Sequence, residues 1–213
     1  MQGWLTKLIL ILVIIMTQSY AKRSEKILCF GNSITDKGSW SQIVEQKSSY
    51  KTINAGLSGR KVAEGKQALQ TYLSKYNDLD KIIIFLGVND LPSRDQRPGV
   101  VKVAKCVTDM NKIINLALTR FDPQDIILAA PCGVNPNQMS QINLRKGYNV
   151  VQPLLAKMEQ DYKTLAKQKG ISFLSLFGIV SDENYKDGLH PNKAGNQEIA
   201  RAVLQYLKSG EQK

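Results

Sequence analysis

Histidine is almost missing from this chain, because His190 is the only one among its 213 residues. Zinc sites built from two or three imidazoles are therefore excluded. The imidazole is also the side chain whose protonation changes most readily near neutral pH. A reaction that needs such a base must use His190 or proceed without one.

Cysteine is scarce too, with Cys29, Cys106 and Cys132 as the complete set. No two of them have the C-x2-C spacing of a zinc-binding pair, so we reject a site made of three cysteines and His190. An odd number of cysteines cannot all pair within one molecule, and a bridge between Cys106 and Cys132 stays open. Cys29 lies in an apolar run and is predicted to be a small buried side chain.

Acidic residues are outnumbered, with 18 Asp and Glu against 29 Lys and Arg, which leaves a net charge of +11. The cations never form runs longer than two and are spread along the chain, so no nucleic-acid partner is expected. The surplus could favour anionic glycans or anionic lipids. A well-solvated basic surface is the simpler interpretation.

A hydrophobic run long enough to span a membrane, roughly 20 residues, is also missing. The stretch Leu8–Met16 is shorter, follows the single cation Lys7, and precedes the small residues Ser19 and Ala21. This pattern is typical of a secretory signal peptide. An uncleaved N-terminal anchor is the alternative.

We therefore predict a signal peptide at residues 1–21 and a single domain at residues 22–213. The domain is expected to be secreted or periplasmic, with no stable membrane insertion after cleavage.

Five short apolar runs alternate with segments of helical period, which is typical of a parallel α/β sheet. The sequence predicts a flavodoxin-like three-layer α/β/α sandwich with five parallel strands. The predicted strands are Lys26–Phe30, Tyr50–Asn54, Lys81–Leu86, Asp125–Ala130 and Ile171–Leu176.

Three helices are predicted from apolar residues that recur on one face. Their inward faces comprise, in the first, Val100, Val103, Ala104, Val107, Met110, Ile114, Ala117, Leu118 and Phe121; in the second, Val151, Leu154, Leu155, Met158, Tyr162, Leu165 and Ala166; in the third, Ile199, Ala202, Val203, Tyr206 and Leu207. Asn192 is a natural N-cap for the last of them.

Ligand sites of open α/β sheets lie beyond the carboxyl ends of the strands, so the loops that follow the strands are the place to search. Four such segments carry polar groups or glycines. They are Gly31–Thr35, Asn54–Gly59, Gly87–Asp90 and Asp187–Pro191.

Together these segments hold the groups that acyl transfer requires. Ser33 can act as a nucleophile if His190 takes its proton, and Asp187 can orient the imidazole. The backbone amides of Ser33 and Gly56 and the carboxamide of Asn89 can stabilise an oxyanion. Each segment alone is better explained as a turn or a helix cap, but four at strand ends favour a site.

The four segments resemble, in the same order, the conserved blocks of the SGNH (GDSL) hydrolase family, closest to its arylesterase and carbohydrate acetylesterase branches. The resemblance covers nearly all of the predicted domain. It implies a carboxylic ester hydrolase without metal or cofactor, with Ser33, His190 and Asp187 as a triad and Ser33, Gly56 and Asn89 as oxyanion donors.

One position departs from the family pattern, because Asn32 stands where the family usually has aspartate. An asparagine keeps an acceptor oxygen but loses the charge. Bracing of the loop is therefore expected to survive while the local field changes.

The substrate is predicted less directly, from the amide-rich segment Pro131–Leu144. Its amides suit sugar hydroxyls, so we expect a short-chain ester, with acetyl on a carbohydrate preferred. The alternatives are lysophospholipase or acyl-thioesterase activity on longer chains, and a catalytically silent glycan-binding domain.

Overall fold

The computed structural model describes residues 23–92 and 96–210. The predicted signal peptide lies outside these residues. Among the described helices, none combines the length and apolar character needed to cross a membrane.

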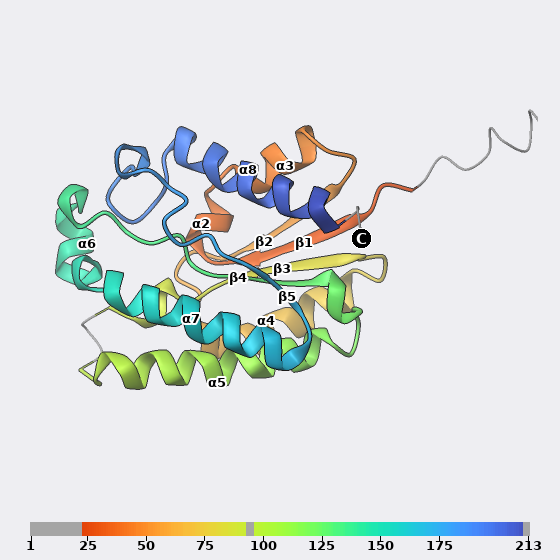
Figure 1. The fold of residues 1–213 in the computed structure, drawn as a ribbon, viewed down its shortest axis with the longest axis horizontal. Coiled ribbons are helices and arrows are strands. Elements are labelled where there is room, and N and C mark those ends of the chain that lie inside the picture. The colour runs from red at the N-terminus through yellow and green to blue at the C-terminus, as the bar shows by residue number, and fades with distance from the viewer. Residues whose placement is uncertain (1–22, 93–95, 211–213) are drawn as a thin grey trace, which may run out of the picture.

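In the described part of the chain, five strands form one parallel sheet in the order β2-β1-β3-β4-β5 (Figure 1). This is the flavodoxin-like order, so the predicted fold is confirmed. The strands are Lys26–Gly31 (β1), Lys51–Gly56 (β2), Lys81–Phe85 (β3), Ile126–Ala129 (β4) and Ser172–Leu174 (β5).

Helices cover both faces of the sheet, with α3 and α8 on one side and α4, α5 and α7 on the other (Figure 1). The helices are Ser33–Asp36 (α2), Trp40–Gln46 (α3), Val62–Lys75 (α4), Gly99–Ala117 (α5), Gln141–Lys146 (α6), Gln152–Lys169 (α7) and Lys193–Gly210 (α8). Short 3-10 turns span Val88–Asp90 (η1), Pro123–Asp125 (η2), Pro136–Gln138 (η3), Tyr148–Val150 (η4) and Asp182–Asn184 (η5).

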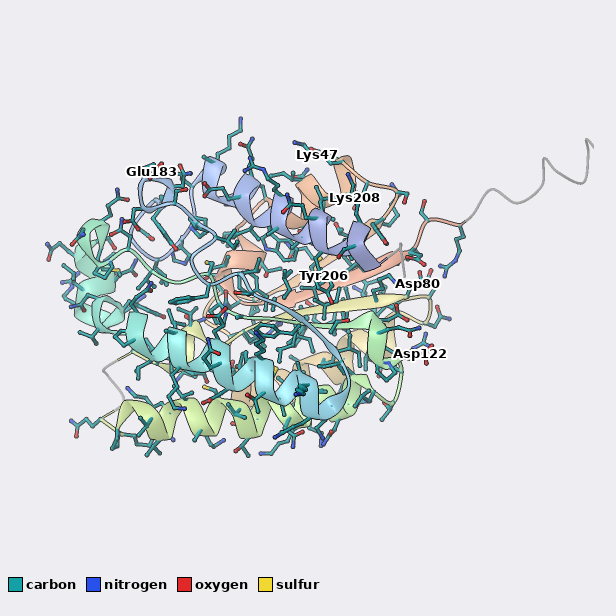
Figure 2. All side chains as sticks on the ribbon, in the orientation of Figure 1. Lys47, Asp80, Asp122, Glu183, Tyr206 and Lys208 are labelled. Carbon is teal, nitrogen blue, oxygen red and sulfur yellow. The ribbon has the colours of Figure 1, made fainter. Side chains whose placement is uncertain are left out.

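Burial explains why the central strands read as continuous apolar runs. Helices cover β3 on both faces, and its residues Ile82–Phe85 are almost completely buried. The edge strand β2 is more exposed and accordingly contains more polar residues. Charged side chains project from all sides of the molecule (Figure 2).

The predicted helix faces are confirmed in most positions. Asn192 caps α8, because its side-chain oxygen accepts from the amides of Ala194 and Gly195 at 2.9 and 3.1 Å. The prediction was wrong at two positions of α5, because Val100 and Ala104, expected to face inward, are exposed. Val100 lies in the first turn of α5, which extends past the carboxyl edge of the sheet (Figure 1).

The glycine at the end of β2 allows α2 to lie directly against the strand. A Cβ atom at Gly56 would lie 2.2 Å from the backbone nitrogen of Asp36 and 2.6 Å from its Cα. Since α2 begins with Ser33, this close packing also sets the height of Ser33 above the sheet.

Gly56→Ala is therefore expected to destabilise the fold by about 1–3 kcal/mol through overpacking. Urea unfolding should show a lower midpoint with an unchanged slope. Gly210→Ala is the matched control, because no atom lies within 4 Å of its added Cβ. Equal midpoints for the two variants would contradict the packing argument.

Candidate active site

A pocket of about 370 Å³ opens beyond the carboxyl ends of β1 and β3. This is the switch point of the sheet, where the chain turns from one side to the other. Ser33, Asn89, Asp187 and His190 all line it. The structure thus brings together four of the five residues predicted from the sequence.

Ser33 reaches the pocket because β1 stops at Gly31 and α2 starts two residues later. Asn32 caps α2, with its side-chain oxygen accepting from the amide of Ile34 at 2.9 Å. Its backbone carbonyl accepts from the amide of Asp36 at 2.8 Å. The expected bracing of this loop therefore exists with asparagine at position 32.

A chain of hydrogen bonds links the serine, the histidine and the aspartate. The Oγ of Ser33 lies 3.0 Å from Nε2 of His190. The Nδ1 of His190 lies 2.9 Å from Oδ2 and 3.1 Å from Oδ1 of Asp187. This geometry allows His190 to take a proton from Ser33 while its other nitrogen is held.

The turn that carries Asp187 also holds its carboxylate in place. Its Oδ1 accepts from the backbone amides of Leu189 at 3.1 Å and His190 at 2.8 Å. Partial burial raises the pKa of Asp187, but the hydrogen bonds from the His190 ring and from these amides outweigh burial and hold it below its ordinary value. Asp187 is therefore a carboxylate when His190 needs a negative partner.

Asn89 is fixed at both ends of its side-chain amide. The hydroxyl of Tyr148 donates to Oδ1 of Asn89 at 2.7 Å, and Nδ2 of Asn89 donates to the carbonyl of Arg60 at 3.1 Å. An amide nitrogen carries two hydrogens, so the second one is left for a ligand in the pocket. Tyr148 also lines the pocket.

The next residue, Asp90, is structural. Its carboxylate accepts from the amide of Val62 at 3.1 and 3.2 Å and so binds the first turn of α4. Burial raises the pKa of Asp90 to about 6.

Gly56, the fifth predicted residue, does not line the pocket. Its amide donates to the side-chain oxygen of Asn54 at 2.9 Å, so it is not available to an oxyanion. The assignment of Gly56 as an oxyanion donor was therefore wrong. Gly59 lines the pocket instead, and we found no acceptor for its amide among the described residues.

Among the pocket residues that the sequence did not assign, Gly59 and Tyr148 bear directly on the candidate oxyanion donors. Gly59 has a positive φ of 83°, in the region that favours glycine, and its place in the loop after β2 was a usable signal. Tyr148 lies 59 positions from Asn89, and nothing in its local sequence indicates that the two side chains meet.

The segment Pro131–Leu144 does not form the amide-rich rim that the sequence suggested, because of its amides only Asn143 lines the pocket. Asn143 donates to the carbonyl of Asp187 at 3.2 Å, and Asn135 donates to the carbonyl of Asp182 at 2.9 Å. These two buried side chains stabilise the loop that carries Asp187 and His190.

The cysteines take no part in the pocket. All three are free and buried, and burial raises the pKa of each thiol above its ordinary value. Within residues 23–92 and 96–210, no group of three or more His, Cys, Asp or Glu side chains is arranged to hold a metal.

Solved structures with the same fold come from several bacteria. The aryl esterase of M. smegmatis has a TM-score of 0.74 and 20% identity, over 87% of this chain and 99% of that one. Est24, a carbohydrate acetylesterase from Sinorhizobium meliloti, has a TM-score of 0.73 with the same identity and coverage. A lipolytic G-D-S-L family protein from Veillonella parvula has a TM-score of 0.65 and 18% identity, again over 87% and 99%. No curated relative matches by sequence.

A serine, a histidine and an aspartate in hydrogen-bonded order are the arrangement by which serine hydrolases activate their nucleophile. A model of the GDSL-like lipase/acylhydrolase family matches residues 29–198. The chain therefore belongs to the GDSL-like lipase/acylhydrolase family, and it is a carboxylic ester hydrolase.

Proposed function

We propose that this protein is a secreted or periplasmic serine esterase that removes short acyl groups, with O-acetyl groups of carbohydrates preferred. The observation that carries the proposal is the aligned series Ser33, His190 and Asp187. It supplies a nucleophile, a base and a carboxylate within hydrogen-bonding distance.

In the proposed reaction, Oγ of Ser33 attacks the ester carbonyl while Nε2 of His190 takes the hydroxyl proton. The imidazolium then returns that proton to the leaving alcohol, and an acyl group stays on Ser33. A water molecule, deprotonated by His190, next attacks the acyl carbon. The bond to Oγ of Ser33 breaks, the imidazolium returns its proton to that oxygen, and the acid is released. Asp187 stabilises the imidazolium in both halves.

Three donors are proposed for the oxyanion of each tetrahedral intermediate. The amide of Ser33 lies at the start of α2, where no intrahelical acceptor exists for it. The amide of Gly59 and Nδ2 of Asn89 approach from two other loops. This set keeps two of the donors expected from the sequence and replaces Gly56 by Gly59.

A short acyl group is favoured by the size and lining of the pocket. Its volume of about 370 Å³ is at the small end of ligand sites. Polar side chains such as Ser58, Asn143 and Asn196 contribute to its lining. Two proteins of the same fold are an aryl esterase and a carbohydrate acetylesterase.

Asn32, the one departure from the family pattern, is the only feature of the sequence that favours the alternative of a silent glycan-binding domain. That alternative loses its support, because Asn32 caps α2 and the hydroxyl of Ser33 still contacts His190.

The nucleophile is tested by covalent labelling. A fluorescent organophosphonate is expected to label the wild-type protein, and Ser33→Ala should abolish both the labelling and the hydrolysis of 4-nitrophenyl acetate. His190→Ala should slow both by at least about 10³-fold, since no second histidine can replace it. Ser58→Ala, at a second pocket serine, should keep its label. Full activity in Ser33→Ala would refute the proposal.

Acyl length is tested with a series of 4-nitrophenyl esters. The small pocket predicts that kcat/KM is highest for acetate and falls by about tenfold or more at octanoate. A steady rise from acetate to octanoate would favour the lysophospholipase or thioesterase alternative.

Tyr148 is proposed to position the oxyanion donor Asn89. Tyr148→Phe removes the hydroxyl that holds Oδ1 of Asn89, so kcat should fall about tenfold while KM changes little. Tyr162→Phe is the matched control, because that buried hydroxyl has no hydrogen-bond partner in the described structure. A change in KM alone would instead place Tyr148 in ground-state binding.

A further inference from the structure

Three lysines that are far apart in the sequence border the same pocket. Lys37 follows α2, Lys146 ends α6, and Lys186 directly precedes Asp187. The even spread of cations along the sequence gave no sign of this grouping. The fold collects the three from separate elements around Ser33.

The negative charge at the pocket is already engaged. Asp187 is the only carboxylate among the described lining residues, and both of its oxygens accept from the His190 turn. Asp36 lies nearby, with Oδ2 at 3.3 Å from Nζ of Lys37, but the hydroxyl of Ser58 donates to the same oxygen at 2.6 Å. Lys37 is thus partly neutralised.

Lys146 and Lys186 have no such compensation. Across the described residues, neither ammonium group has a hydrogen bond or an ion pair. Lys146 is half-buried and Lys186 is exposed. Their ammonium groups therefore add positive charge to the pocket without a direct ion pair to a carboxylate.

The two lysines also lie on elements that contact each other. Asn143 and Lys146 are three residues apart on α6 and share a helix face. Asn143 donates to the carbonyl of Asp187, which follows Lys186. The contact between α6 and this turn thus joins the two elements that bring Lys146 and Lys186 to the pocket.

We propose that the substrate is an anionic ester, whose carboxylate, phosphate or sulfate group binds between Lys146 and Lys186 while its ester carbonyl reaches Ser33. A cleft lined by one sign of charge concentrates ligands of the opposite sign. A neutral acetylated sugar would gain nothing from the two ammonium groups. This inference rests on the proposed esterase function and narrows its substrate to a small soluble anion.

The test compares two acetyl esters of the same shape, 4-acetoxybenzoate, which is an anion, and 4-acetoxybenzamide, which is neutral. The double variant Lys146→Gln with Lys186→Gln is measured beside Lys66→Gln with Lys163→Gln. The control pair removes the same charge from exposed positions on α4 and α7, outside the pocket. For each ester, the kcat/KM of a variant is divided by that of the wild type, so the intrinsic reactivity of the ester cancels.

The pocket variant is expected to lose about tenfold in kcat/KM on 4-acetoxybenzoate and to keep its rate on 4-acetoxybenzamide. The control variant should match the wild type on both esters. Raising ionic strength should weaken the wild-type preference for the anion. Replacing the carboxylate by a sulfonate tests whether any anionic group suffices.

Equal losses in the pocket and control variants would overturn the inference, because net charge would then be the cause. The inference would also be overturned if the pocket variant lost kcat/KM equally on both esters. A third contrary result is a loss in the pocket variant that is seen only with lysophospholipid on anionic vesicles. Hydrolysis of 4-acetoxybenzamide without a charge preference refutes this inference alone. No hydrolysis of either ester, with no labelling of Ser33, refutes the esterase proposal itself.

Discussion

The parallel pairing of β1 with β2 on one side and β3 on the other is the constraint on which the pocket depends. Gly31, the last residue of β1, lies level with Gly56 of β2 and Phe85 of β3. Three chain segments therefore leave the sheet at the same edge and the same height. Ser33, Gly59 and Asn89 follow within two to four residues of these strand ends.

Arg60 ties the three segments together. Its buried guanidinium donates to the carbonyls of Gly31 at 2.8 Å and Ala55 at 2.5 Å, and lies over the ring of Phe30 at 4.5 Å. Its own carbonyl accepts from Asn89. The planar guanidinium suits this role because it can donate to several fixed acceptors at once. Arg60 thus links the ends of β1 and β2, through its guanidinium, to the residue proposed to stabilise the oxyanion, through its backbone carbonyl.

Sequence reasoning succeeded where the signal is local. The buried run at Lys81–Phe85 and the polar groups at Ser33, Asn89, Asp187 and His190 could be read from short windows, because strand burial and turn chemistry depend on near neighbours. Short windows were not sufficient to choose between Gly56 and Gly59 as the oxyanion donor. Both glycines occur in one loop, and only the hydrogen bond from Gly56 to Asn54 decides which amide faces the pocket.

By itself, the sequence determined the class of fold, the family and the lone imidazole on which the proposed chemistry depends. Only the tertiary structure decided which groups surround that imidazole. It placed Tyr148 on Asn89 and turned the amides of Asn135 and Asn143 toward backbone carbonyls. It also set Lys146 beside the turn of Lys186. The physical reason is that these contacts join positions tens of residues apart, whose distance depends on how α6 packs against the end of the sheet.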